Sequence, residues 1–318
     1  MPHVAFATVP ELCEDPLTGD QVILAPGRAR RPDTHRGAAP TRDVSPRVGS
    51  CPFCPGNEHQ TPPEVQRTGS GAPDTPGWRV RVVPNLYPIV GGSVPGAHEV
   101  VVLSPDHATP FGRLHDDTAA EVFAVLRERA AHHLAAGLAH AQPFVNCGKA
   151  AGASIEHPHA QLIALGFVPP NVEHAVQRFA RRGHDLVALA IDDALDGTHG
   201  VLQGSALAWC APASLSPYEV LVAHPASSAR FDHAPDEEVA AVAHATRRAV
   251  AAISEVLDDP PYNIVVHTAP ATERRHFHWY VRVSPRLGVA AGFEQGTGLF
   301  VNTVPPETAA AELREAAG

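Results

Sequence analysis

Two histidines stand one proline apart in the stretch GASIEHPHAQ, which occupies residues 152–161. If this stretch enters a strand, His157 and His159 project to the same face, because side chains two residues apart do so. A neutral imidazole can bind a metal ion or attack phosphorus, provided that a hydrogen bond holds its other nitrogen in one tautomer. The chain holds 20 histidines, so an ordinary pair of core residues is the alternative.

The residues around this pair are of the types that a phosphate group needs. Gly148 and Gly152 allow the backbone to approach a ligand closely, and Ser154 adds a hydroxyl group. Gln161 returns to the strand face of His159 and can bond a non-bridging phosphate oxygen. The stretch therefore predicts phosphoryl chemistry, a metal site, or both.

A second group of metal-binding residue types lies about 100 residues earlier, in CPFCPGNE. Cys51 and Cys54 form a Cys-x-x-Cys turn, which presents two thiolates to one ion and is common in zinc sites. A redox pair is the main alternative. Two further ligands are available in His107, which ends a strand-type run, and in His157. His107 could equally be a surface turn residue.

Two long segments of the chain read alike. Each has two strand-type runs and then a helix-type run that begins near an aspartate. The first segment reads GWRVRVVPN, HEVVVLSPDH and DDTAAEVFAVLRERAAHHLA, and the second reads SALAWCAPA, YEVLVAHPAS and PDEEVAAVAHATRRAVAAIS. A repeat of roughly 120 residues is too long for a solenoid and indicates two related domains. Residues 171–200 predict a helix that bridges them, and residues 25–77 read as a long loop region.

The histidine pair has a counterpart in the second segment. The stretch ERRHFHWYVRVSP places His276 and His278 at nearly the same offset. Neither a Cys-x-x-Cys nor a Gly-Ala-Ser precedes them in the repeat. We therefore expect a degenerate copy with structural histidines, and a substrate contact is the alternative.

Composition restricts the partners. The formal net charge is −10 and the sequence has no long basic run, which argues against a nucleic-acid-binding surface. Five sparse cysteines suit a reducing compartment, and no run of 18 apolar residues predicts a membrane span. The N-terminal residues do not read as a signal peptide, so a cytoplasmic location is expected.

The stretch NCGKAAGASIEHPHAQ resembles the active-site motif of galactose-1-phosphate uridylyltransferases, a family of the histidine triad superfamily. The likeness covers almost the whole chain, because DPLTGDQVILAPGRARRPD, CPFCPGNE, RVVPNLYP, HEVVVLSPDH and PRLGVAAGFEQGTGLFVNTVPPE follow in the family's order. ADP-glucose phosphorylases and diadenosine tetraphosphate phosphorylases share much of this pattern. The resemblance therefore leaves the base, uracil or adenine, and the acceptor open.

The resemblance implies a role for each matching residue. His159 falls on the nucleophile that carries the nucleotidyl group, and Ser154 and Gln161 fall on phosphate-contacting positions. One zinc ion per chain is implied, with its ligands at Cys51, Cys54, His107 and His157. The expected substrate-binding residues are Arg28, Arg31, Arg81, Asn85, Asn146, Gly152, Phe293 and Glu294.

The resemblance also implies the architecture. We expect an α+β fold of two histidine-triad-like domains, each an antiparallel half-barrel sheet packed with helices. Residues 1–168 would hold the zinc site and the catalytic histidine, and residues 169–318 a degenerate copy with the sugar-contacting loop. In the family this loop, here with Phe293 and Glu294, serves the neighbouring subunit, so a homodimer is expected.

Two departures from the family pattern affect the prediction. Tyr280 and Arg282 stand where family histidines bind a second metal, so no second metal is predicted. A family lysine ahead of the sugar-binding glutamate is absent from LGVAAGFE, so the resemblance does not fix galactose 1-phosphate as the acceptor.

Three functions follow from these residues. The first is a nucleotidyltransferase that exchanges a nucleoside monophosphate between a nucleotide sugar and a sugar 1-phosphate, with UDP-glucose and hexose 1-phosphate as the expected pair. The second is a phosphorylase of ADP-glucose or of dinucleoside polyphosphates, with phosphate as the acceptor. The third, a catalytically silent nucleotide-binding protein, is disfavoured because His159 is present.

Overall fold

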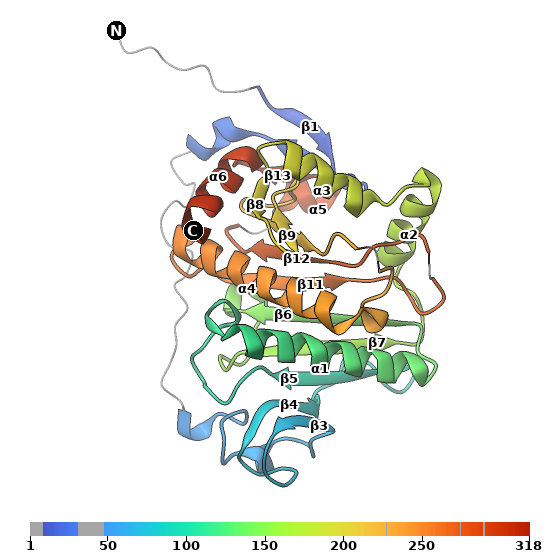
Figure 1. Ribbon diagram of the computed structural model, residues 1–318, viewed down its shortest axis with the longest axis vertical. Helices are drawn as coiled ribbons and strands as arrows, with labels where there is room; N and C mark the ends of the chain where they lie inside the picture. Colours follow the sequence, from blue (N-terminus) through green and yellow to red (C-terminus); the bar gives the residue numbers. More distant parts are fainter. Residues whose placement is uncertain (1–8, 31–47, 227, 274, 289) are drawn as a thin grey trace.

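The structure is a computed structural model of the 318-residue chain. It describes residues 9–30, 48–226, 228–273, 275–288 and 290–318. The predicted substrate residue Arg31 lies outside the described residues. Figure 1 shows two long helices lying side by side in front of one extended sheet.

One ten-stranded sheet forms the centre of the molecule. Its spatial order is β3-β4-β5-β7-β6-β11-β12-β10-β9-β8, and every neighbouring pair is antiparallel. The strands of the first half are β3 (Gln66–Gly69), β4 (Trp78–Pro84), β5 (Gly96–Val102), β6 (His140–Cys147) and β7 (His159–Leu165). Those of the second half are β8 (Gly200–Leu202), β9 (Leu207–Trp209), β10 (Val220–Ala223), β11 (Tyr262–His267) and β12 (Tyr280–Pro285).

The two long helices cover one face of this sheet. They are α1 (Asp116–Ala135) and α4 (Asp236–Leu257), one from each repeat, and they pack against each other (Figure 1). Alternate strand residues such as Val80 and Val82 point into the core beneath them, together with Val122 and Val242 of the helices. The strand and helix segments predicted from the repeat are therefore confirmed.

Two shorter helices cover the opposite face of the second half. They are α2 (Pro170–Arg182) and α3 (Leu186–Asp196), and they bury Phe179 and Ile191 against that face. The single helix predicted for residues 171–200 is wrong. Gly183 adopts a left-handed conformation with φ 67°, which ends α2, and the Asp185 side chain accepts from the Val187 and Ala188 amides to begin α3.

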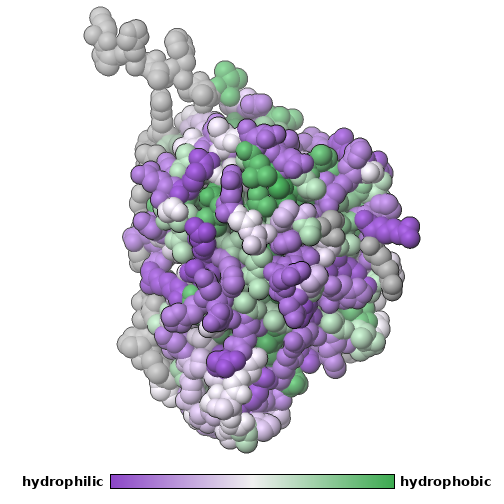
Figure 2. All heavy atoms as spheres, in the orientation of Figure 1, coloured by the Kyte–Doolittle hydropathy of each residue, from purple (hydrophilic) through white to green (hydrophobic). Residues whose placement is uncertain are grey.

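The remaining elements lie at one end of the molecule. A small sheet has the order β1 (Glu11–Glu14), β2 (Gln21–Leu24) and β13 (Phe300–Asn302), which joins the two ends of the chain. The last helices are α5 (Gly292–Thr297) and α6 (Pro306–Ala317). On the face that Figure 2 shows, hydrophilic side chains predominate, and hydrophobic atoms gather mainly over α3, whose Leu189 and Leu195 are exposed.

The strand register fixes which residues of the repeat correspond. Gln161 pairs with Val100 and Phe144, and Arg282 pairs with Leu221 and Val265, so each position recurs 121 residues later. By the same spacing, His278 is the counterpart of His157, and Tyr280 is the counterpart of His159. The sequence-based pairing of His276 and His278 with the active pair is thus wrong by two residues, because spacing alone could not fix the register.

The expected α+β class with antiparallel sheets and packed helices is confirmed. The division into residues 1–168 and 169–318 stays a prediction, since β6 and β11 pair directly and join both halves into one sheet. No helix in the described ranges is at once long and apolar enough to cross a membrane.

Candidate active site and metal centre

His159 is the first residue of β7, at the point where the chain leaves the loop that follows the 3-10 helix Lys149–Ala151. Its Nδ1 lies 2.9 Å from the carbonyl oxygen of His157. A carbonyl oxygen can only accept, so Nδ1 carries the proton and Nε2 keeps a free lone pair. Burial lowers the pKa of His159, which favours this neutral form. The ring is held as a nucleophile requires.

A pocket with an empty volume of about 630 Å³ opens at His159. One wall is the predicted pair Ser154 and Gln161, and another is Asn85, which follows β4. The rest of the lining is mainly apolar or aromatic: Pro52, Phe53, Gln60, Thr61, Pro62, Val83, Pro84, Leu86, Tyr87, Val100 and Ile155. An apolar pocket with a few convergent polar groups is typical of a small-molecule site.

Gln161 is held from behind by His98 of β5. The backbone N–H of Ile89 donates to Nδ1 of His98 over 3.4 Å, so the proton of this ring lies on Nε2. That nitrogen lies 2.8 Å from Oε1 of Gln161 and donates to it. The amide NH2 of Gln161 is then left to face a ligand. The Asn85 amide nitrogen lies 3.1 Å from the same ring nitrogen, but both are donors in this tautomer, so the pair adds no hydrogen bond.

Asn146 lies on β6, the strand next to β7, and is not among the residues that line the pocket at His159. Val145 pairs with Ala160, and continuing this antiparallel register by one residue sets Asn146 opposite His159. Its side-chain oxygen accepts from Nδ2 of Asn263 over 2.7 Å. Gly152, predicted to contact substrate, has φ 91°, and a Cβ there would lie 3.4 Å from Nδ2 of Asn146. Only glycine leaves this amide nitrogen uncovered without backbone strain.

The four predicted metal ligands come together although they are up to 106 residues apart in sequence. Their ligand atoms all lie within 4.8 Å of one another, and all four residues are buried. Sγ of Cys54 is 3.3 Å from Nδ1 of His107 and 3.6 Å from Nδ1 of His157, and Sγ of Cys51 is 3.8 Å from the latter. Sulfur and nitrogen ligands of tetrahedral zinc lie about 3.6 Å apart, so the cluster fits a zinc ion.

The chemistry of these side chains also fits a cation. Burial, and then the charge of Cys51 beside it, raise the pKa of Cys54 to about 11, so two thiolates need a positive ion between them. Burial lowers the pKa of His157 to about 4, which keeps it neutral as a ligand must be. The Nε2–H of His157 donates to the Ser104 carbonyl oxygen over 2.9 Å, which aims Nδ1 at the thiols.

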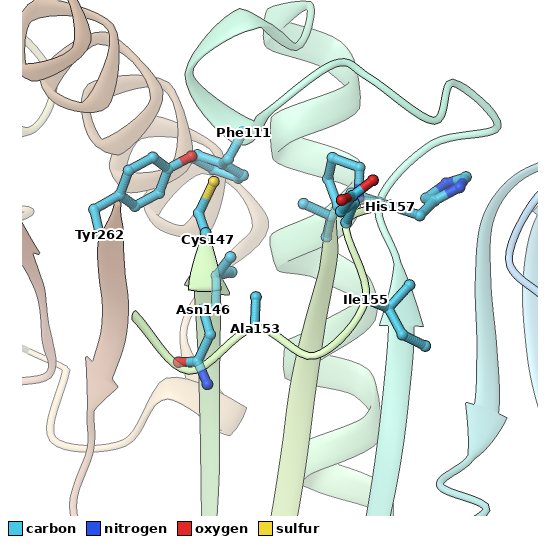
Figure 3. A pocket seen from close by; sticks show the side chains of 12 residues that line it. Phe111, Asn146, Cys147, Ala153, Ile155, His157 and Tyr262 are labelled. Carbon is cyan, nitrogen blue, oxygen red and sulfur yellow. The ribbon is translucent and has the colours of Figure 1, made fainter. Parts of the chain in front are cut away.

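The cluster is tied to the reactive histidine through Phe53, the third residue of Cys-Pro-Phe-Cys. The Phe53 ring meets the His159 ring edge to face with centroids 5.4 Å apart, and the His157 ring at 6.2 Å. Figure 3 shows the loop that carries Ala153 and Ile155 running from the end of β6 to His157. Asn146 and Cys147 point away from each other at that strand end, as strand alternation requires (Figure 3).

Other predicted substrate residues do not line this pocket. Arg81 is buried and bonds Glu64, Asp74 and Thr61, with distances of 2.8, 2.7 and 3.0 Å. It therefore fixes Thr61, which does line the pocket. Arg28 is exposed in the 3-10 helix Pro26–Arg30. The predicted substrate roles of these arginines stay predictions.

The predicted sugar-contacting residues lie on α5, in the second half. Phe293 is 47% exposed, and the Glu294 carboxylate accepts from the Ala291 amide over 2.9 Å, which caps the helix. Neither residue lines the pocket of its own chain. Their contact with substrate stays a prediction that requires a second subunit.

Sequence reasoning missed His98, Asn263 and Phe53 as parts of the site. Phe53 could have been found, because it stands between two predicted zinc ligands. His98 and Asn263 carry no local signal, since each reaches the site only through the pairing of its strand.

Comparisons with known proteins agree with this geometry. Residues 123–316 match the family described as a domain of unknown function, DUF4921. The chain is 31% identical to ADP-glucose phosphorylase of Arabidopsis thaliana, over 96% of this chain and 93% of that protein. It is 26% identical to galactose-1-phosphate uridylyltransferase of Thermotoga maritima, over 96% and 98% of the two chains.

A solved structure gives the same result. The crystal structure of an ADP-glucose phosphorylase from Arabidopsis thaliana with bound ADP-glucose superimposes with a TM-score of 0.85 and 28% identity, covering 97% of this chain and 99% of that one. Fold, site and likeness together define an enzyme of the nucleotidyltransferase class. The chain belongs to the family of ADP-glucose phosphorylase and the galactose-1-phosphate uridylyltransferases, and it also matches the DUF4921 family.

Proposed function

We propose that the protein moves a nucleoside monophosphate from a nucleotide sugar to a sugar 1-phosphate through a covalent nucleotidyl-His159 intermediate. The observation that carries the proposal is the ring of His159, neutral, locked by its Nδ1–H and open to the pocket through Nε2. In the first step Nε2 forms a bond to the α-phosphorus, the bond to the bridging oxygen breaks, and the sugar 1-phosphate leaves. In the second step another sugar 1-phosphate takes the nucleotidyl group and frees His159.

The residues around His159 suit this reaction. Charge on the transferring phosphoryl group needs fixed donors, and the site offers the amide NH2 groups of Gln161 and Asn146 and the Ser154 hydroxyl. Gly152 lets the loop backbone approach the phosphate. The apolar and aromatic walls beyond, such as Phe53 and Tyr87, suit a nucleoside.

The donor is the first question for experiment. We expect UDP-glucose to be the donor and hexose 1-phosphate the acceptor. The protein is incubated separately with UDP-glucose and ADP-glucose, each labelled in the α-phosphate, and the covalently bound label is measured. Labelling by neither, or labelling that persists in His159→Ala, would contradict a nucleotidyl-histidine enzyme.

A second function is favoured by a specific comparison. The 31% identity over nearly the full length is to an ADP-glucose phosphorylase, in which phosphate would be the acceptor. The same labelled enzyme distinguishes the two. Release of the label by inorganic phosphate as a nucleoside diphosphate supports the phosphorylase, whereas release only by a sugar 1-phosphate supports the exchange reaction. Labelling by ADP-glucose rather than UDP-glucose would also support the phosphorylase.

Zinc is the proposed metal of the Cys51, Cys54, His107 and His157 cluster, with one ion per chain. All four ligand positions are filled by protein, so the ion would be structural and would hold the Cys-Pro-Phe-Cys loop against the strand ends. The chemistry at His159 is carried by the chain's own groups. The Phe53 ring connects the two, since it packs on both histidines.

A homodimer with shared sites is the proposed assembly. The exposed Phe293 and the absence of Glu294 from the lining of its own chain's described pocket support it. His159→Ala and Glu294→Ala chains are mixed and allowed to exchange subunits. Shared sites would restore activity to about a quarter of the sites by random pairing, because each heterodimer has one undamaged site.

The mixing test needs one control for the helix cap. Glu294→Gln keeps an oxygen that can accept from the Ala291 N–H, so it separates loss of the cap from loss of a sugar contact. If mixed chains regain no activity although subunit exchange is confirmed by mass spectrometry, the shared site is wrong.

A further inference from the structure

The second half of the chain sends one polar side chain into the catalytic site of the first. Asn263 lies on β11 directly opposite Asn146 on β6, where the two halves of the sheet meet. It is 6% exposed, so its amide must be satisfied by the protein. Nδ2 of Asn263 donates to Oδ1 of Asn146 over 2.7 Å and to the carbonyl oxygen of Ala151 over 2.9 Å.

The orientation of this amide follows from partners that cannot reverse their roles. The Arg286 guanidinium can only donate, and its Nε bonds the oxygen of Asn263. The Ala151 carbonyl can only accept, so it faces the NH2 group of Asn263. Both ends of the Asn263 amide are therefore fixed without any choice of flip.

The fixed amide of Asn263 in turn fixes Asn146. Because Asn263 presents an NH2 group, the atom of Asn146 that faces it must be the oxygen. The NH2 group of Asn146 then points to the other side, toward Gly152. In the described part of the chain no residue accepts a hydrogen bond from this NH2 group. A free donor thus stands beside His159 where a phosphate oxygen would lie.

We propose that Asn263, backed by Arg286, is a positioning residue for nucleotidyl transfer that locks the Asn146 amide with its NH2 group toward the phosphate. This inference rests on the proposed function, because it assigns the phosphate of the nucleotide to the space beside His159. It also explains why the first half alone is an incomplete site: the half that carries the nucleophile does not contain the group that orients its neighbour.

Asn263→Asp is the sharpest test, because it reverses one end of the network. The new carboxylate still accepts from Arg286, but its second oxygen can no longer donate to the Ala151 carbonyl and itself needs a donor, so Asn146 turns its NH2 group inward and its oxygen toward the phosphate. We expect the single-turnover rate of nucleotidyl-enzyme formation to fall about 30- to 100-fold, since a donor to the phosphoryl group is replaced by an acceptor. In Asn263→Ala, which only releases Asn146, the same rate should fall about five- to tenfold.

A double-mutant cycle separates positioning from a general disturbance. In the Asn146→Ala background neither Asn263 substitution should change the rate by more than about twofold, because its effect acts through Asn146. Equal losses in both backgrounds would overturn the proposal and assign Asn263 to the loop at Ala151. The matched control is Gln142→Ala: Gln142 holds the equivalent place in the repeat, crosses to the Val266 carbonyl over 2.8 Å, and should leave the rate within about twofold.

A measurement independent of activity tests the orientation itself. The chain has six asparagines, so the side-chain amides of protein labelled with ¹⁵N-asparagine can be assigned by single substitutions. The NH2 protons of Asn146 should show a nuclear Overhauser effect to an α-hydrogen of Gly152, which stands where a Cβ would be 3.4 Å from the nitrogen. Asn263→Asp should abolish it, and an unchanged signal would overturn the proposal. Absence of covalent labelling in the wild type would instead contradict the proposed function.

Discussion

The sheet face that carries His159 in the first half carries Tyr280 in the second, at the equivalent place in the register. In the first half this face borders a pocket of about 630 Å³. In the second half the Tyr280 ring is buried and stacks on His267 with centroids 4.5 Å apart. Side chains of α2 and α3 and Leu17 cover it as part of a continuous hydrophobic cluster.

The polar residues of the two faces also differ in whether they are open to a ligand. Gln161 is replaced by Arg282, which bonds Asp15 over 2.7 Å and Glu219 over 3.1 Å, both buried. Burial opposes the charge of Arg282, but the two carboxylates outweigh it and raise its pKa, so the guanidinium stays protonated. The one face keeps neutral groups with free donors, whereas on the other the charged groups pair with one another.

The metal position differs most clearly. His157 directs Nδ1 at two thiols, and its counterpart His278 directs Nδ1 at the carboxylate of Asp185, 2.9 Å away. In both, Nε2 lies 2.9 Å from a backbone carbonyl, that of Ser104 or of His224. The same backbone therefore holds a histidine in the same way, and the residues brought to its other nitrogen decide between a metal ligand and a structural contact.

The largest expected difference is between His159 and Tyr280. His159→Ala should lower the exchange rate at least about 10³-fold, because the covalent route is lost, with little change in stability. Tyr280→Ala should leave the rate per folded molecule nearly unchanged and destabilise the protein by about 3–5 kcal/mol, as for other buried aromatic side chains. The exchange rates and the urea unfolding of both variants test these two expectations. Loss of exchange activity in a folded Tyr280→Ala variant would contradict the assignment of catalysis to the first face alone. Partial rescue of His159→Gly by added imidazole would support His159 as the nucleophile.

The next difference is between His157 and His278. His157→Asn should reduce zinc, measured by elemental analysis, from one ion per chain to a small fraction, and should destabilise the protein by several kcal/mol, on the order of 4. His278→Asn should keep the zinc and cost about 1–3 kcal/mol through its two lost hydrogen bonds. Full zinc content in folded His157→Asn, or in Cys51→Ser, would contradict the assignment of the zinc site to this cluster.

The smallest expected difference is between His98 and Glu219, which are equivalent in the register. His98→Leu should slow formation of the nucleotidyl enzyme about five- to tenfold, because the oxygen of Gln161 loses its donor. Glu219→Gln should change this rate less than about twofold and lower stability by about 1–3 kcal/mol, because Arg282 loses a buried charge partner. Covalent labelling stopped at set times measures the rate, and thermal unfolding measures the stability of both variants. Equal effects of the two substitutions on the rate would mean that the second face also takes part in catalysis.

Local patterns in the sequence were sufficient for the strands and helices of the repeat, though not for the two helices in residues 171–200, and for the candidate nucleophile and metal ligands. Alternating β-branched residues predict β4 and β5, and an acidic start followed by periodic apolar residues predicts α1 and α4. The Cys-x-x-Cys turn and the histidine pair are each contained in a few residues, so their types and spacing were readable. The roles of His159 and His107 were added by resemblance to a family, not by spacing.

The tertiary structure alone decided what surrounds those residues. The register of β6 against β11 brings Asn263 to Asn146, and that of β5 against β7 brings His98 near Gln161. Arg81 was predicted to contact substrate from its segment, yet its place beside Glu64 and Asp74 gives it two carboxylate partners. Sequence determines which groups a segment offers, because that is a local property. Which groups meet, and which face stays open, depends on strand pairing and covering helices, because these join residues far apart in the chain, here 63 and 117 positions.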